Sequence, residues 1–169
     1  GAFAAYALIK AGYGRLTRGF FDFCANALTQ KGYLMHKYNP DGTAGSSWHP
    51  WLEEGVVQLP IQEDETALVL WAIWEYYRQE RDLEFVLGHY HDLVRPAAHF
   101  LSSYVDENLR LPAESFDLWE ERRGIFTFTT AAVHAGLTSA SKLAQLFGQP
   151  KLAEKFAWRA AEMKESLVK

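Results

Sequence analysis

The chain has 169 residues, of which 49% are hydrophobic and 22% are charged, and its formal net charge at pH 7 is −4. This length and composition are typical of a single domain with a sizeable apolar core. No basic stripe alternates with aromatic residues, and no apolar run approaches the roughly 20 residues that span a bilayer. Nucleic acid and membranes are therefore not expected as partners.

The only cysteine, Cys24, excludes an internal disulfide. Its apolar neighbours predict a buried and inert thiol. Such cysteine usage is compatible with a cytoplasmic or a secreted protein and slightly favours the cytoplasm. The sequence opens with Gly1 inside a predicted helix, so we expect this N-terminus to be a cut edge.

Hydrophobic residues recur at helical spacing through most of the chain. The predicted helices cover residues 2–11, 16–28, 65–79, 83–104, 128–147 and 152–167. Asp82 is expected to cap the fourth helix, and Pro96 predicts a kink or break near Arg95. The helix over 65–79 is apolar on all faces, which is typical of an inner-layer helix. We therefore predict an all-α fold of antiparallel helical hairpins.

Two segments, 33–60 and 109–124, lack helical periodicity. The first contains the turn signal Asn39-Pro40-Asp41-Gly42, with short extended pieces expected at 34–38 and 56–59. Long irregular segments are uncommon in compact domains and are often functional. These two segments are therefore the first places to look for a site.

The second irregular segment contains the motif Ser115-Phe116-Asp117-Leu118-Trp119-Glu120-Glu121. Hydrolysis of a glycosidic bond needs a carboxylic acid that still carries its proton near neutral pH. An apolar neighbour such as Trp119 and a second acid such as Glu121 both raise the pKa of a carboxyl group. Asp117 is expected to orient the loop or to bind sugar hydroxyls. On spacing alone, a solvated helix N-terminus is the favoured explanation of Glu120 and Glu121.

A second acidic group, Gln62-Glu63-Asp64-Glu65, stands at the start of the most buried predicted helix. One interpretation is that Glu63 or Asp64 caps this helix. The other is that the acids face a pocket at the end of the core, because a surface cap rarely leads directly into a helix that is apolar all round. The pattern leaves both interpretations open.

Aromatic side chains gather in the first irregular segment, at Tyr38, Trp48 and Trp51, with His49 between the last two. Aromatic faces pack against the apolar faces of flat ligands such as sugar rings. The alternative is a loop anchored to the core by its hydrophobic residues.

The histidines do not have the spacing of a metal site. His89 and His91 fall on different helix faces, and His99 and His134 are isolated, so no ligand set is completed. The sequence also lacks a phosphate-binding loop, a dinucleotide fingerprint and a nucleophile elbow. Neither a metal nor a cofactor is expected.

Taken together, these segments resemble glycoside hydrolase family fifteen, the glucoamylase and glucodextranase family, and in particular its prokaryotic members. The matching stretches occur in the family's order over about the first 140 residues. They are Gly1-Ala2-Phe3 through Gly12-Tyr13, Tyr38 through Gly42, Ser47-Trp48-His49, Leu59 through Trp71, Asp117 through Glu121, and Phe126 through Ala132.

The resemblance implies an (α/α)6 toroid and an inverting, exo-acting hydrolysis of α-glucosidic bonds in glucans. Glu120 matches the family's general acid. Glu121, Trp119 and the backbone of Leu118 match positions that line the sugar subsite beside the cleaved bond, and Asp117 begins the same motif.

The same resemblance implies that Gln62, Asp64 and Glu65 belong to a second active-site loop that binds substrate. Trp48 and His49 match a further substrate loop. The implied partner is an oligosaccharide or polysaccharide of α-glucose.

Two parts of the family's machinery are not in this sequence. The Arg-Asp pair that holds the terminal glucose would precede Gly1, and the general base would follow Lys169. We therefore expect residues 1–169 to be a fragment of the catalytic domain, incomplete at both ends and inactive without the remaining half of the toroid. Alternatives are a trehalose- or dextran-cleaving relative, or a helical module that binds a glycan or a regulator without cleaving it.

Overall fold

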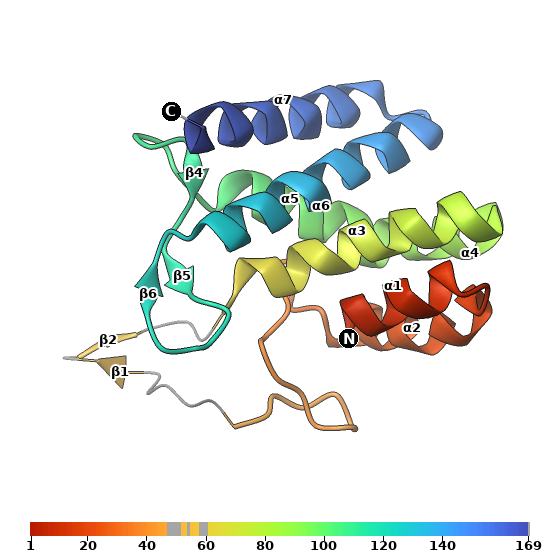
Figure 1. Ribbon diagram of the computed structural model, residues 1–169, viewed down its shortest axis with the longest axis horizontal. Helices are drawn as coiled ribbons and strands as arrows, with labels where there is room; N and C mark the ends of the chain where they lie inside the picture. Colours follow the sequence, from red (N-terminus) through yellow and green to blue (C-terminus); the bar gives the residue numbers. More distant parts are fainter. Residues whose placement is uncertain (47–51, 54, 58–60, 169) are drawn as a thin grey trace.

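The computed structural model describes residues 1–46, 52–53, 55–57 and 61–168, and its helices confirm the all-α class (Figure 1). The helices are α1 (Ala2–Lys10), α2 (Arg18–Ala27), α3 (Glu63–Glu80), α4 (Leu83–His89), α5 (Arg95–Ser103), α6 (Thr127–Leu146) and α7 (Pro150–Leu167). A 3-10 turn, Gly14–Thr17, precedes α2. Within the described ranges, none of the helices combines the length and the hydropathy of a membrane-spanning segment.

Three short antiparallel hairpins occupy the irregular segments. They pair β1 (Leu52–Glu53) with β2 (Val56–Val57), β3 (Val105–Asp106) with β4 (Leu111–Pro112), and β5 (Ser115–Phe116) with β6 (Arg123–Gly124). Strand β2 confirms part of the extended piece expected at 56–59. In the piece expected at 34–38, Tyr38 forms an isolated bridge with Ala44.

The break predicted near Arg95 is confirmed, and it takes the form of a π-helical turn at Tyr90–Val94. Pro96 has no N–H to donate, so the helix cannot continue with an unbroken α-helical ladder at this point. The Arg95 N–H bonds to the carbonyl oxygen of Tyr90, five residues earlier, which gives the helix one wide turn before α5 begins. Asp82 caps α4 as expected, because its Oδ1 accepts the N–H of Phe85 at 3.1 Å.

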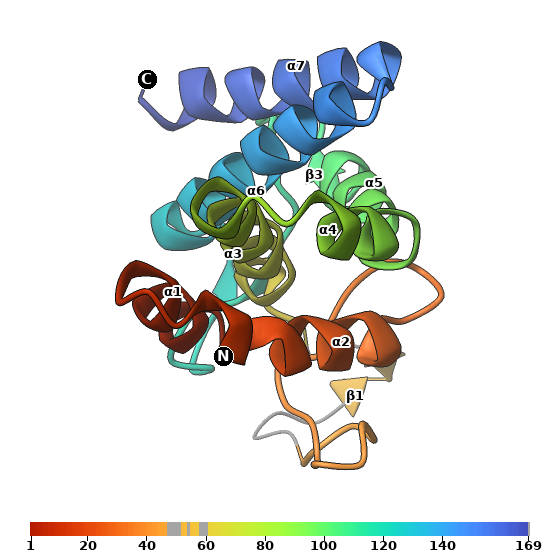
Figure 2. The ribbon, with the colours of Figure 1, turned by 90° about the vertical axis from the view of Figure 1, so that its right-hand side faces the viewer.

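The helices form two adjoining rows. Helix α3 packs between α1 and α6 in the first row, while α2, α4–α5 and α7 lie beside them in the second (Figure 2). Helices α3 and α6 both begin at the end of the molecule that carries β5 and β6 (Figure 1). Hairpins stacked side by side in this way are compatible with part of an (α/α)6 toroid, and closure into a ring stays a prediction.

Helix α3 is buried as its sequence predicts. Its fully buried apolar residues are Ala67, Val69, Leu70, Ala72, Ile73 and Tyr76, and its other large apolar residues are half-buried. Cys24 of α2 lies in the same core, and burial raises the pKa of its thiol to about 12. The predicted inert cysteine is therefore confirmed, because a thiol with that pKa is not ionised near neutral pH.

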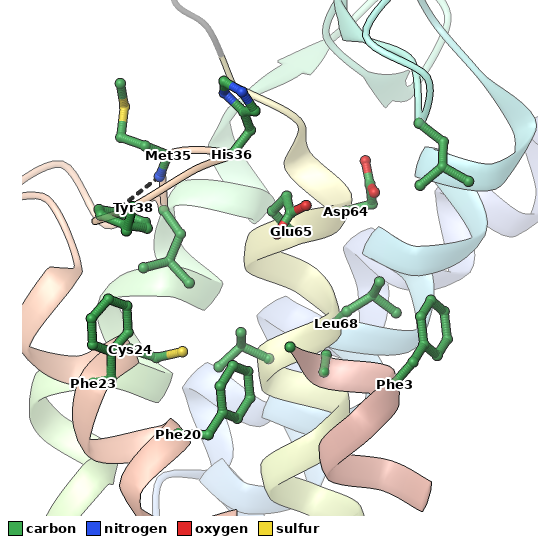
Figure 3. A pocket seen from close by; sticks show the side chains of 15 residues that line it. Phe3, Phe20, Phe23, Cys24, Met35, His36, Tyr38, Asp64, Glu65 and Leu68 are labelled. Carbon is green, nitrogen blue, oxygen red and sulfur yellow. Dashed lines mark hydrogen bonds between the residues drawn. The ribbon is translucent and has the colours of Figure 1, made fainter. Parts of the chain in front are cut away.

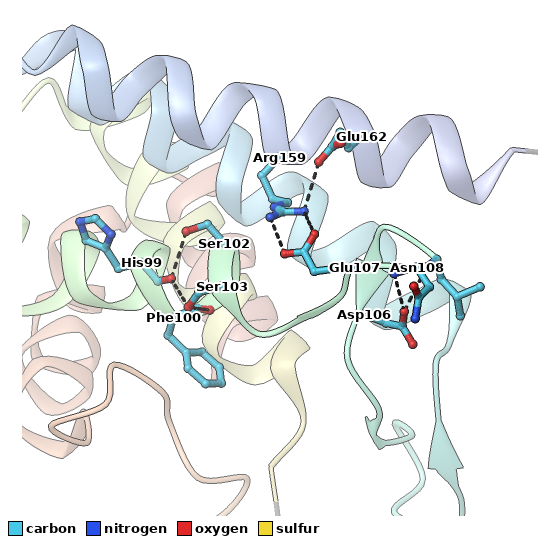
Figure 4. A network of polar contacts seen from close by, with 10 residues as sticks. His99, Phe100, Ser102, Ser103, Asp106, Glu107, Asn108, Arg159 and Glu162 are labelled. Carbon is cyan, nitrogen blue, oxygen red and sulfur yellow. Dashed lines mark hydrogen bonds and ion pairs between the residues drawn. The ribbon is translucent and has the colours of Figure 1, made fainter.

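A guanidinium group ties the last helix to the β3–β4 hairpin, which precedes the motif Ser115 through Glu121 (Figure 4). Arg159 of α7 donates two hydrogen bonds to the carboxylate of Glu107, at 2.9 and 3.2 Å, and a third to Glu162 at 3.1 Å. The turn itself is closed by Asp106, which accepts the N–H groups of Asn108 and Leu109. These contacts attach the β3–β4 hairpin, which directly precedes β5, to α7.

The closest approach of α3 and α6 depends on Gly136. A Cβ atom at this position would lie 2.7 Å from the carbonyl oxygen of Ala67, whereas one at Gly88 of α4 would meet nothing within 4 Å. We expect Gly136→Ala to lower the free energy of unfolding by about 1–3 kcal/mol, because overpacking outweighs the better helix propensity of alanine.

The matched control is Gly88→Ala, which should raise the free energy of unfolding by about 0.5–1 kcal/mol from helix propensity alone. Urea unfolding followed by circular dichroism measures both variants. Equal responses of the two would show that Gly136 does not set the distance between α3 and α6.

Candidate active site

Asp117 organises the loop between β5 and β6. Its carboxylate Oδ1 accepts the N–H groups of Glu121 at 2.8 Å and Arg122 at 3.3 Å, and its carbonyl oxygen accepts the N–H of Glu120 at 2.9 Å. These bonds hold Glu120 in the left-handed region, with φ of 58°. Non-glycine residues pay about 1 kcal/mol or more for this conformation, which recurs at functional sites.

Residues at the start of α3 are hydrogen-bonded to the same loop. The N–H of Phe116 donates to the carbonyl oxygen of Ile61 at 3.2 Å, and the side-chain amide of Gln62 donates to the carbonyl oxygen of Asp117. Gln62 is buried, and its amide supports the loop backbone. Its expected contact with substrate stays a prediction.

The carboxylate of Glu120 lies against a histidine from the first irregular segment. Its Oε2 is 3.1 Å from Nε2 of His36, and the two side chains are 22% and 6% exposed. The two residues are 84 positions apart in the sequence. Nothing in the local sequence pattern around His36 predicts this contact.

A pocket of about 200 Å³ opens beside these residues (Figure 3). His36, Asp64 and Glu65 lie at one end of it, and Phe20 and Phe23 lie toward the other. The full lining is Gly1, Ala2, Phe3, Phe20, Phe23, Cys24, Leu34, Met35, His36, Tyr38, Asp64, Glu65, Leu68, Val69 and Leu118. The site thus has a polar end and an apolar end, as sugar sites need for hydroxyls and ring faces.

The two acids of α3 that line the pocket are electrostatically perturbed. Burial raises the pKa of Asp64, while hydrogen bonds from its own backbone and from Thr129, at 3.3 Å, partly offset the rise. Glu65 is accessible to solvent yet recessed within the pocket, and its pKa is raised to about 7 by desolvation first, then by the charges of Asp64 and Glu120. The influence of Glu120 on Glu65 places both carboxylates in one electrostatic cluster.

Glu63 is the third acid of this turn, but it does not line the pocket. Its carboxyl group is buried without a well-formed hydrogen bond, and desolvation raises its pKa to about 8 despite the nearby Ser115 hydroxyl. The interpretation that Glu63 or Asp64 caps α3 is wrong, because Gln62 occupies the N-cap position and no side chain accepts the cap hydrogen bond. The buried turn leaves both carboxyl groups inside the protein.

The structure gathers some of the predicted site residues and separates others. Glu120 lies beside the pocket that Asp64, Glu65 and Leu118 line, so the simple alternative of a carboxylate in open solvent is wrong for Glu120. Trp119 is 79% exposed, and Glu121 is exposed beside it. Trp48 and His49, like Trp51, lie outside the described residues.

The described residues contain no group of three or more His, Cys, Asp or Glu side chains arranged to hold a metal ion. The polar groups that the structure places at this site are carboxyl groups and the imidazole of His36, beside an aromatic lining.

Comparison with known proteins gives one family and two curated relatives. The model of glycosyl hydrolases family 15 matches residues 56–169. An uncharacterized glycosyl hydrolase of Methanocaldococcus jannaschii is 30% identical over 149 residues, which cover 86% of this chain and 21% of that protein. Trehalase 2 of Sulfolobus acidocaldarius is 31% identical over 184 residues, covering 99% of this chain and 31% of that protein. The chain thus spans less than one third of either relative, and no solved structure matches it significantly.

The buried carboxyl group of Glu63 should make stability depend on pH. Its pKa is about 8 in the folded protein and about 4.5 in an unfolded chain. Between these values the unfolded chain releases the proton while the folded protein keeps it, so the free energy of unfolding falls as pH rises. We expect Glu63→Gln to remove this fall, giving an advantage over the parent of roughly 4 kcal/mol at pH 8 and little at pH 4.5.

Thermal unfolding from pH 4.5 to pH 9 measures the effect, with the exposed Glu121→Gln as the control for loss of one negative charge. The control should follow the parent at every pH. Parallel curves for Glu63→Gln and the parent would contradict a buried, protonated Glu63.

Proposed function

The chain belongs to the glycosyl hydrolases of family 15, and from this membership we propose that the protein hydrolyses α-glucosidic bonds of a glucan, from the non-reducing end and with inversion. The observation that carries the proposal is the placement of Glu120. Its carboxyl group is held by a strained and anchored loop at the edge of an acid-lined pocket.

In this proposal Glu120 is the general acid. It donates its proton to the glycosidic oxygen as the bond from the anomeric carbon to that oxygen breaks, and the electron pair leaves with the protonated oxygen. The anchoring of the loop by Asp117 supports the role, because proton donation requires a carboxyl group within hydrogen-bond reach of the leaving atom.

Inversion needs a second carboxylate that activates water on the opposite face of the sugar, about 6.5–9.5 Å from the acid. Asp64 and Glu65 are adjacent on the first turn of α3, and we assign them to binding sugar hydroxyls. We propose that the base comes from helices outside this chain, which complete an (α/α)6 toroid with residues 1–169. The coverage of only 21% and 31% of the two relatives supports this division.

We further propose that substrate is contacted by Trp48, His49, Asp117, Leu118, Trp119 and Glu121. Gln62 is proposed to contact substrate as well, next to the backbone of Asp117 that its amide supports. The exposure of Trp119 next to Glu120 supports a platform for a sugar ring at the pocket edge. The position of Leu118 in the pocket lining supports a subsite at the same place.

Trehalose is the second candidate substrate. The relative from Sulfolobus acidocaldarius that aligns with 99% of this chain is named a trehalase. Trehalose is also an α-glucoside, so the same acid and the same inverting geometry apply, and only the leaving group changes. Cleavage of dextran and glycan binding without cleavage are the remaining alternatives.

The test is hydrolysis by the full-length protein of maltooligosaccharides, trehalose and isomaltose, with the anomer of the first glucose released followed by NMR. We expect β-glucose from at least one substrate. Glu120→Gln should lower kcat about 10²–10⁴-fold, because an amide cannot donate the required proton.

Asp106→Asn is the matched control, since Asp106 is an acid that closes the β3–β4 turn outside the pocket. It should keep parental activity. Release of α-glucose from the non-reducing end of a maltooligosaccharide would overturn inversion, whereas inverting cleavage of trehalose gives one α- and one β-glucose. Full activity of Glu120→Gln would remove Glu120 from the mechanism. Binding of these sugars without turnover by the parent would favour the non-catalytic module.

A further inference from the structure

The proposed mechanism gives a role to the carboxyl group of Glu120 but none to His36, which contacts it. The imidazole Nε2 lies 3.1 Å from Glu120 Oε2 in an ion-pair contact that is not aligned as a hydrogen bond, and the histidine side chain is almost completely buried. A buried polar group requires a partner, and burial also limits the rotamers that it can adopt. The position of His36 is therefore fixed by the fold and not by solvent.

The backbone on either side of His36 is anchored to different parts of the scaffold. The N–H of Leu34 donates to the Thr66 hydroxyl of α3 at 2.9 Å, and the N–H of Met35 donates to the Tyr38 hydroxyl at 2.7 Å (Figure 3). The Tyr38 hydroxyl in turn donates to the carbonyl oxygen of Ala27 at the end of α2, at 3.2 Å. This segment and the Glu120 loop are thus both anchored near the start of α3, by different hydrogen bonds, and each brings one polar atom to the same point.

We propose that His36 is the positioning residue for the general acid. It donates its Nε2–H to Oε2 of Glu120, so that this oxygen is occupied and the proton for the leaving group is carried on Oε1. The inference rests on the proposed function, because it assumes that Glu120 is the acid. The contact at 3.1 Å shortens and aligns when substrate fills the pocket, as catalytic hydrogen bonds do.

The chemistry of the step favours such a donor. When Glu120 gives up its proton, its carboxyl group becomes a carboxylate, and a hydrogen bond from a neutral imidazole becomes charge-assisted. The bond is then stronger after proton transfer than before, which stabilises the transition state relative to the bound substrate. Glu65 and Asp64 are the other carboxyl groups at this end of the pocket, and their ionised forms favour a hydrogen-bond donor at His36.

Two substitutions separate the two ring nitrogens. In His36→Gln the side-chain amide nitrogen takes roughly the place of Nε2, whereas in His36→Asn it takes roughly the place of Nδ1 and cannot reach Glu120. Both variants are polar and of similar burial, so differences between them report on the Nε2 contact. His91→Asn, at an exposed histidine of the π-helical turn, is the control for loss of an imidazole.

The readout compares two substrates in the full-length protein. Maltose or trehalose has a poor leaving group that needs a proton, whereas α-glucosyl fluoride loses fluoride with little help from an acid. We expect His36→Asn to lower kcat on the disaccharide about 10–100-fold with KM nearly unchanged, and to leave kcat on the fluoride within about 3-fold. His36→Gln should recover most of the disaccharide activity, and His91→Asn should match the parent.

Equal losses on both substrates would overturn the inference, because they would indicate a structural role for His36. Equal activity of the Gln and Asn variants would overturn it as well, because Nε2 would then not matter. An inverting parent enzyme combined with either result would leave the proposed function intact. Absence of hydrolysis by the parent would instead overturn the proposed function and this inference together.

Discussion

The first turn of α3 places three carboxyl groups against the end of an apolar core, and the arrangement of the site depends on this constraint. Desolvation raises the pKa of Glu63, Asp64 and Glu65 alike. The helix N-terminus favours negative charge there, and polar neighbours such as Thr129 and Ser115 offset part of the penalty. Gln62, at the N-cap of the same turn, is also hydrogen-bonded to the loop that carries Glu120. The acids and their support are therefore parts of a single structural unit.

This unit can be held in place because the two rows of helices are rigid and tightly packed. Helix α3 contacts both neighbours in its row, and Gly136 lets α6 approach its backbone directly. The chain leaves the second row through the turn at Asp106, which Arg159 fastens to α7 (Figure 4). Functional loops on a rigid scaffold keep their geometry although they are irregular.

The sequence predicts the helices well because their signals are local. Apolar spacing, the Asp82 cap and the effect of Pro96 each act within one or two turns, and each is confirmed. The hairpins from β3 to β6 were not predicted, because strands of two residues are too short to show an alternation of apolar and polar residues. The cap expected from Glu63 or Asp64 failed because tertiary burial overrode a local preference.

For the site, the two acidic motifs, at 62–65 and 115–121, predict the two segments that meet at the pocket. The resemblance to glycoside hydrolase family fifteen identifies Glu120 among their acids. The contact of His36 with Glu120 could not be predicted, because it joins segments 84 residues apart through tertiary hydrogen bonds to the start of α3. The amide of Gln62 donates to a backbone carbonyl oxygen, and every residue has such a group, so the sequence does not indicate which one is bound. Physical reasoning from one sequence finds residues with chemical character more readily than the contacts that orient them.

The left-handed backbone of Glu120 has a consequence for how such a protein evolves. Glycine or asparagine would adopt this φ with less strain, by about 1 kcal/mol. Under the proposed role of Glu120 as the general acid, the residue that the chemistry requires is therefore not the one best suited to the turn. Selection for stability alone would therefore drift away from glutamate at this position. In a relative that no longer catalyses the reaction, we expect Glu120 to be replaced early, and the replacement would reduce the backbone strain of the turn.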